Sequence, residues 1–157
     1  MKINLVCIGK TDDPYILEGI KKYTDRLKHY CTFELVIIPD IKHAKNIDRT
    51  ILKQKEGEEI CKHIQDSDLI ILLDDKGKSY SSIEFANYIN KQQVNSVKKL
   101  SVVIGGAFGF SEEVYSKTQN KLSLSKMTFS HQIIRIIFLE QLYRAFTIIK
   151  GEKYHHE

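Results

Sequence analysis

Four short apolar runs recur along this chain, and no other feature of the sequence constrains the fold more strongly. They cover residues 3–8, 33–38, 69–73 and 100–104. Each run is rich in Val, Ile and Leu and is almost continuously apolar, without regular polar alternation. Continuous runs of this kind are typical of strands that are buried on both faces of a parallel sheet. The pattern therefore predicts an α/β fold in which helices cover both faces of the sheet.

Segments with helical spacing lie between these runs. A helix over residues 15–30 is predicted by Asp12-Asp13-Pro14, in which a capping residue precedes a proline of the first turn. The charged residues 49–64 predict a solvent-facing helix. Ser81-Ser82 signals the start of a helix that ends near residue 90, and Ser111-Glu112-Glu113 signals another. Strands and helices thus alternate, as the α/β class requires.

The last predicted helix, residues 132–150, is apolar on nearly all sides. Glu140, Arg144 and Thr147 form one narrow polar stripe along it. A helix of this kind must be buried almost all round. In so small a protein, we expect a second subunit to supply one wall of that burial. The helix therefore predicts a homodimer.

Composition limits the class of protein. A length of 157 residues, 42% apolar and 28% charged, fits one globular domain, which we expect to span residues 1–157. No apolar run approaches the roughly 20 residues that cross a bilayer, and no basic leader precedes the first predicted strand. Cys7, Cys31 and Cys61 are far apart and form no CxxC motif. We therefore expect a cytoplasmic protein with reduced cysteines and no membrane partner.

The net charge of +4 gathers toward the C-terminus, where residues from Lys121 onward include six Lys or Arg against three Glu. Such a bias fits either a solvated surface or a polyanionic partner.

A glycine cluster, Gly105-Gly106-Ala107-Phe108-Gly109, follows the run 100–104 directly. Glycines at this place mean that the backbone turns tightly or that a ligand approaches it closely. Ligands of parallel sheets bind beyond the carboxyl ends of the strands, where this cluster falls. The cluster is neither GxGxxG nor a Walker A loop, so it is either a structural turn or a loop that binds a ligand through backbone groups.

Asp74-Asp75-Lys76-Gly77-Lys78 follows the run 69–73 at the same edge. Paired carboxylates could hold a metal or act as acid and base, but adjacent strand residues point to opposite faces. A solvated turn is the preferred interpretation. His155 and His156 are neighbours without partner ligands in the sequence, so we expect no metal.

Residues 122–129 alternate apolar side chains with Ser and Thr. They line a polar pocket, or they are a strand end followed by a cap, Thr128 or Ser130, of the last helix. A nucleophilic serine is not expected, because no GxSxG context is present. The terminal Tyr154-His155-His156 is either a frayed end or a group suited to RNA contact and proton transfer.

Taken together, these motifs resemble the RlmH family, the SPOUT-class methyltransferases of pseudouridine N3 in large-subunit ribosomal RNA. The resemblance covers essentially the whole chain, and one departure is Ser130, where the family usually has proline. It rests on residues 73–78 with Ser81-Ser82, residues 103–109, residues 122–129, His131-Gln132, Arg135, residues 140–145 and Tyr154-His155. Residues 3–10 and Tyr23, Arg26 and Leu27 fit it as well.

The resemblance implies a single SPOUT-type domain with a C-terminal trefoil knot and an obligate homodimer. It implies S-adenosylmethionine as methyl donor and 23S rRNA of the assembled 70S ribosome as substrate, with no DNA partner. The cofactor would be bound by Leu73, Gly105, Leu124, Ser125, Lys126, Met127, Thr128 and Phe129.

Three residues are candidates for catalysis in this scheme. Arg144 would stabilise negative charge on the base or a phosphate. Tyr154 and His155 would hold the base and assist loss of the N3 proton, without a decision on which accepts it. The methyl donor and N3 need mainly to be aligned, so proximity dominates the expected catalysis.

Two other functions fit part of the sequence. A small-molecule module that binds a nucleotide or flavin explains the glycine cluster but not the C-terminal residues. A ribosome-associated dimer without catalysis explains the basic bias but not the glycine cluster beside the hydroxyl-rich loop.

Overall fold

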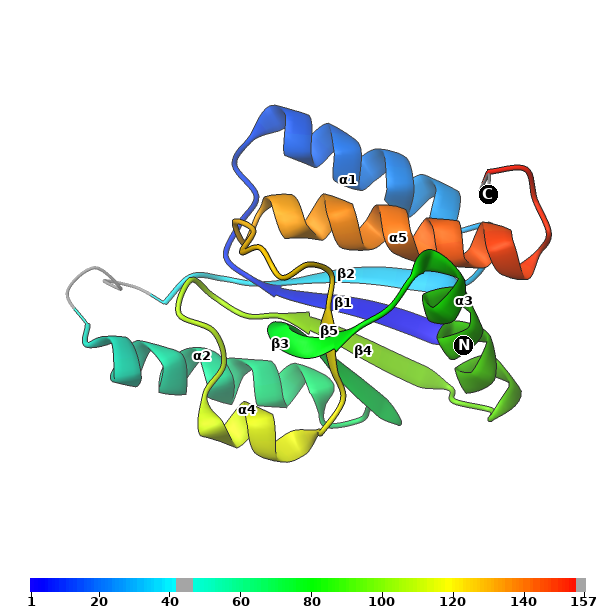
Figure 1. Cartoon of the computed structure of the whole chain (residues 1–157). Helices are drawn as coiled ribbons and strands as arrows, with labels where there is room; N and C mark the ends of the chain where they lie inside the picture. The colour runs from blue at the N-terminus through cyan, green and yellow to red at the C-terminus, as the bar shows by residue number, and fades with distance from the viewer. Residues whose placement is uncertain (42–46, 155–157) are drawn as a thin grey trace.

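Five parallel strands form one sheet, in the order β2-β1-β4-β3-β5. The computed structural model describes residues 1–41 and 47–154 (Figure 1). The strands are β1 (Lys2–Ile8), β2 (Thr32–Ile38), β3 (Leu69–Ser79), β4 (Lys99–Ile104) and β5 (Lys121–Ser123). The helices are α1 (Pro14–Leu27), α2 (Arg49–Ile64), α3 (Ser82–Val94), α4 (Glu112–Lys117) and α5 (Ile133–Ile149). The expected α/β architecture is confirmed.

Helices cover both faces of the sheet, as Figure 1 shows. α1, α3 and α5 pack on one face, and α2 and α4 pack on the other. The side chains of β1 alternate accordingly: Ile3 and Leu5 face the first layer, and Val6 and Ile8 face the second. All four are buried, which explains why the strand reads as a continuous apolar run.

Side-chain hydrogen bonds cap the starts of α2, α3 and α5, whereas Asp13, before the predicted first-turn proline of α1, makes no such bond. Ser81 and Glu84 form a reciprocal capping box at the start of α3. Asp48 accepts a 2.8 Å hydrogen bond from the Thr50 N–H at the start of α2. Of the two caps considered for the last helix, Ser130 accepts a 3.2 Å bond from the Ile133 N–H. Ser130 therefore serves the start of α5 although it replaces the proline of the family pattern.

The helix predicted over residues 49–64 is confirmed as α2, but the expectation that it faces only solvent was wrong. α2 buries Leu52, Glu56, Ile60 and Ile64, which recur every four residues along one side. Its charged residues occupy the other side. Because charged residues are so frequent in this segment, the apolar stripe that packs on the sheet is difficult to recognise from the sequence.

The prediction of a solvated turn at residues 74–78 was also wrong, because β3 continues to Ser79. The strand pairs with β5 twice, first at Leu73 and again at Lys78, both opposite Leu122. Residues 74–77 lie between these two pairings, and within this segment Gly77 lies directly against the backbone of Lys121 and Leu122. A Cβ there would lie 2.6 Å from the Lys121 carbonyl carbon. Glycine thus lets two backbones approach where a side chain would separate them.

The last helix, α5, lies between α1 and α3 above the sheet. Within one chain, packing against α1 and α3 already covers most of the apolar side chains of α5. One stripe remains exposed or half-buried, formed by Ile133, Ile137, Gln141, Arg144 and Ile148. None of the helices within the described ranges is long and apolar enough to cross a membrane. The trefoil knot implied by the resemblance stays a prediction.

Candidate functional site

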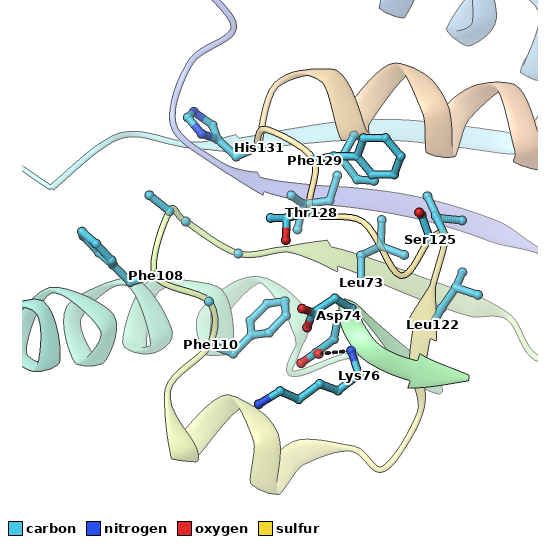
Figure 2. A pocket seen from close by; sticks show the side chains of 18 of the residues that line it. Leu73, Asp74, Lys76, Phe108, Phe110, Leu122, Ser125, Thr128, Phe129 and His131 are labelled. Atoms are coloured by element: carbon cyan, nitrogen blue, oxygen red, sulfur yellow. Dashed lines mark hydrogen bonds between the residues drawn. The ribbon is translucent and has the colours of Figure 1, made fainter. Parts of the chain in front are cut away.

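A cavity of about 620 Å³ opens at the carboxyl ends of β3 and β4. Its walls come from residues 73–76, which lie in β3 just beyond its pairing with β4, from the glycine cluster 105–109 after β4, and from the loop after β5 (Figure 2). His131 and Ile134, at the start of α5, complete the wall. The cavity therefore lies at the edge where open parallel sheets bind ligands.

The cavity gathers seven of the eight predicted cofactor residues. These are Leu73, Gly105, Leu124, Ser125, Met127, Thr128 and Phe129. The eighth, Lys126, is exposed and does not line the cavity. Residues separated by as many as 56 positions in the chain thus share one wall.

The hydroxyl groups of the loop after β5 shape its backbone. Ser123 donates a 2.9 Å hydrogen bond to the Ser125 carbonyl, and Ser125 accepts one of 2.9 Å from the Met127 N–H. The glycine cluster is closed by a 3.1 Å bond from the Gly109 N–H to the Gly106 carbonyl. Both loops are therefore internally braced, and they border the cavity partly through backbone.

Large apolar side chains are exposed around the cavity. The exposed fractions are 76% for Met127, 42% for Phe108 and 38% for Phe129. Apolar groups gathered in one exposed region mark ligand-binding or protein-contact surfaces. The cavity thus combines braced polar backbone with aromatic and aliphatic faces, which suits a flat, partly polar ligand.

Asp74 is a cavity residue that the sequence analysis assigned to a turn. Its carboxylate accepts a 2.7 Å bond from the Tyr115 hydroxyl and a 2.9 Å bond from the Lys76 N–H. Burial alone would raise the pKa of Asp74, but these hydrogen bonds outweigh it and hold the pKa below its usual range. An ionised acceptor therefore lines the cavity. Its position directly after the apolar run 69–73 was the available signal.

Other wall residues had no sequence signal of their own. Phe110, Glu112, Tyr115 and Lys53 reach the cavity through the packing of α4 and α2. Among the described residues, no group of three or more His, Cys, Asp or Glu side chains is arranged to hold a metal ion.

A second cluster forms around Glu140 on α5. Its Oε1 accepts hydrogen bonds from Arg144 Nη2 at 2.6 Å and from the Tyr154 hydroxyl at 3.1 Å. The Arg144 guanidinium lies 4.8 Å from the centre of the Tyr154 ring, and the Tyr143 ring meets that ring edge-on at 4.8 Å. The predicted catalytic residues Arg144 and Tyr154 are thus in contact with each other.

The protonation of Tyr154 follows from this environment. Burial, together with the neighbouring Glu140 carboxylate, raises the pKa of Tyr154 above its usual value. Within one chain the phenol is therefore a hydrogen-bond donor at neutral pH. The third candidate, His155, lies outside the described residues.

One chain does not bring the two clusters together. Ile134 lines the cavity and Arg144 lies ten residues further along α5. At 1.5 Å of rise per residue, that separation is roughly 15 Å along the helix axis. Neither Arg144 nor Tyr154 lines the cavity.

Comparison with known proteins identifies relatives over the full length. Residues 1–155 match the sequence model of a family described as "Predicted SPOUT methyltransferase". The protein called ribosomal RNA large subunit methyltransferase H of Christiangramia forsetii is 56% identical, over 99% of each chain. Its namesake of Parabacteroides distasonis is 53% identical over 100% of each chain.

A solved structure supports the fold independently. A probable methylase family protein from Haemophilus influenzae superposes with a TM-score of 0.56 and 16% identity, over 97% of this chain and 67% of its own. At that identity the likeness concerns the arrangement of helices and strands alone.

Proposed function

Because this chain belongs to the SPOUT methyltransferase family, we propose that it methylates N3 of a pseudouridine in 23S rRNA, with S-adenosylmethionine as methyl donor. The observation that carries the proposal is the cavity at the carboxyl ends of β3 and β4, with its seven predicted cofactor residues. The relatives of 56% and 53% identity, both called ribosomal RNA large subunit methyltransferase H, support large-subunit rRNA as the substrate.

The chemistry of the cavity fits the cofactor. Leu73, Leu124 and Phe129 offer apolar faces to a purine ring, and the braced loop after β5 offers peptide groups to its polar edge. The ionised Asp74 carboxylate adds negative charge to the wall, which suits a cationic ligand. When bound, S-adenosylmethionine supplies an electrophilic methyl group. The task of the cavity residues is then to orient that group toward the incoming base.

A homodimer completes this scheme. The cavity and the Arg144–Tyr154 cluster lie at different places on one chain, so a second copy must supply the cluster if both act on one base. The exposed side chains of Met127 and Phe129 lie beside the cavity, and the half-exposed stripe of α5 leads from Ile133 toward Arg144. An interface on these residues would cover apolar surface and bring one chain's cluster toward the other chain's cavity.

The chain's residues divide the chemical step between them. N3 must lose its proton, and the base then carries negative charge. The Arg144 guanidinium stabilises that charge or holds a nearby phosphate. The Tyr154 hydroxyl, kept protonated, donates a hydrogen bond to the base, while His155 is left as the candidate proton acceptor.

Recognition of the RNA requires more surface than the cavity offers. The net charge is only +4 on 157 residues, which gives weak sequence-independent attraction to RNA. We therefore expect the assembled 70S ribosome to present the target in a shape that fits the dimer. This substrate would place the enzyme in the cytoplasm.

Methyl transfer from labelled S-adenosylmethionine tests the proposal. The substrates are intact ribosomes, free large subunits and naked rRNA, all from a strain that lacks this gene. Label mapped to a single pseudouridine, on assembled ribosomes only, supports the proposal in full. Efficient methylation of naked rRNA contradicts the shape requirement. Binding of the cofactor without any transfer of label contradicts the substrate and leaves the cofactor site standing.

A further inference from the structure

A second cavity, of about 460 Å³, adjoins the first. The two share the wall residues Gly106, Ala107, Phe108 and His131. Figure 2 shows Phe108 and His131 at the end of the first cavity that is remote from Leu122 and Ser125. The second cavity extends from the shared wall toward the start of α2 and the ends of β1 and β2, where Arg49, Leu52, Glu56, Ile8, Ile47 and Asp40 line it.

Glu56 is the most unusual residue of this second cavity. It is only 7% exposed, and its Oε2 atom is buried without a hydrogen-bond partner among the described residues. Removing a carboxylate from water is costly unless hydrogen bonds or an opposite charge compensate. Burial, and to a smaller extent the charge of Asp40, raises the pKa of Glu56. Among the described residues, Glu56 Oε2 is therefore left without a donor or a cation within hydrogen-bond distance.

The glycine cluster is shaped around this carboxylate. A Cβ added at Gly106 would lie 2.6 Å from Glu56 Oε1 and 2.8 Å from its Cδ. Any side chain at position 106 would therefore displace the carboxylate. The same glycine lines both cavities, so the carboxylate sits directly behind the loop that borders the proposed cofactor site.

The opposite charge in this cavity comes from Arg49. Its guanidinium lies 5.0 Å from the centre of the Phe108 ring, in the shared wall. Among the described residues, the lining thus carries the carboxylates of Glu56 and Asp40, the guanidinium of Arg49 and the imidazole of His131. This set is complementary to a zwitterion that has an ammonium group and a carboxylate.

We propose that the second cavity binds the amino-acid end of S-adenosylmethionine, with the α-ammonium group at Glu56 and Asp40 and the α-carboxylate at Arg49. The inference rests on the proposed function, since it assumes that the adenosyl end occupies the first cavity. The shared wall lets one ligand extend from one cavity into the other around Gly106 and Phe108. Glu56 and Arg49 then select a ligand with an intact amino-acid end over a bare nucleoside.

The test measures binding of two ligands by calorimetry. S-adenosylhomocysteine keeps the amino-acid end, whereas 5′-methylthioadenosine lacks it. The Glu56→Gln variant should bind S-adenosylhomocysteine about 10- to 100-fold more weakly, because the negative charge that would face the α-ammonium group is lost. Its affinity for 5′-methylthioadenosine should stay within about twofold of wild type, which also shows that the variant is folded. The exposed Glu58→Gln on the same helix is the matched control.

A second variant separates the two ends of the zwitterion. Arg49→Gln should weaken the binding of S-adenosylhomocysteine but not the binding of its decarboxylated analogue. Glu56→Gln should weaken the binding of both ligands. The inference would be overturned, and Glu56 assigned a structural role, if Glu56→Gln lost affinity equally for all ligands or lost no affinity for any of them. If wild type binds S-adenosylhomocysteine normally in that case, the proposed function survives. If wild type binds none of these ligands, the cofactor assignment fails and the inference fails with it.

Discussion

The guanidinium of Arg135 donates a 2.6 Å hydrogen bond to the hydroxyl of Thr11, joining the start of α5 to the loop after β1. Arg135 is fully buried and also donates to the carbonyls of Ile8, Gly9 and His131. Within the described ranges it forms no ion pair. A buried cation satisfied by neutral oxygens thus fixes the end of β1 to the segment that carries the cavity residue His131.

Replacement of Arg135 by Met should therefore destabilise the fold, because its buried acceptors lose their donor. We expect a loss of about 2 to 5 kcal/mol in the free energy of unfolding, measured by urea titration. Lys55→Met, at an exposed position of α2, should change this free energy by less than about 0.5 kcal/mol. Equal stability of the two variants would show that the Arg135 hydrogen bonds contribute nothing net.

Phe129→Ala should weaken binding of S-adenosylmethionine. An aromatic face against a nucleobase contributes about 1 to 3 kcal/mol, so we expect a rise in Kd of roughly 5- to 150-fold. Isothermal calorimetry measures the change directly. Val94→Ala, which alters a 74% exposed apolar residue at the end of α3, serves as the control and should bind normally. Unchanged binding by Phe129→Ala would remove this ring from the cofactor site.

Arg144→Met should reduce the rate of methyl transfer without weakening the binding of the cofactor. Arg144 does not line the cavity, so the Kd for S-adenosylmethionine should stay within about twofold of wild type. Single-turnover rates on ribosomes should fall by about 100-fold or more, as is usual when a group that stabilises developing charge is lost. Tyr154→Phe and His155→Ala should also slow this step. Normal turnover by both of these variants would refute their assignment to proton transfer.

Ile137→Glu should separate the proposed dimer. Ile137 lies on the half-exposed stripe of α5, and a carboxylate there would be buried by a partner copy. Sedimentation at micromolar concentration should show a monomer, and methyl transfer should be lost. Ile51→Glu, at a 46% exposed position of α2 in the opposite layer, should leave the dimer intact. A monomeric wild-type protein would contradict the dimer itself.

Asp74 should make stability depend on pH in acid. Its pKa is lowered in the folded state, so the unfolded chain binds the proton more readily. The stabilisation is complete above the unfolded pKa of about 3.9 and is lost as pH falls through the lower folded value. Wild type should therefore exceed Asp74→Asn in stability above about pH 5, and the difference should shrink toward pH 2.

Urea titrations across this pH range check that prediction. Asp66→Asn, at an exposed position between α2 and β3, is the control and should follow wild type throughout. A gap between wild type and Asp74→Asn that is constant with pH would mean that the hydrogen bonds of Asp74 do not favour its ionised form.

The four apolar runs of the sequence correspond to β1, β2, β3 and β4. The central strands β1 and β4 are buried on both faces and need continuous apolar side chains, whereas β2 lies at the edge of the sheet and is only partly buried. The extension of β3 past Leu73 could not be predicted in the same way. Its residues are polar, and it becomes a strand through pairing with the three-residue β5 about 45 positions later. Such pairing leaves no periodic pattern in a local stretch of sequence.

The candidate site shows a similar division. Glycines and polar residues directly after apolar runs predicted the edge of the sheet at which the cavity lies. Glu56 was missed because it stands in a strongly charged segment, and its burial, with Gly106 packed against its carboxylate, becomes visible only in the structure. The distance between Arg144 and the cavity was equally hidden, since sequence alone did not place α5 between α1 and α3.

The central place of α5 between α1 and α3 has a consequence for biosynthesis. Both neighbours are complete by residue 94, whereas α5 begins only at Ile133. During translation the apolar surfaces of α1 and α3 that face α5 therefore stay uncovered until α5 has been synthesised. The cavity wall at His131 and Ile134 forms at the same late stage. The core on this face of the sheet and this part of the cavity wall are thus completed together, and a chain that ends before α5 would have neither, although the core on the opposite face contains no α5 residue.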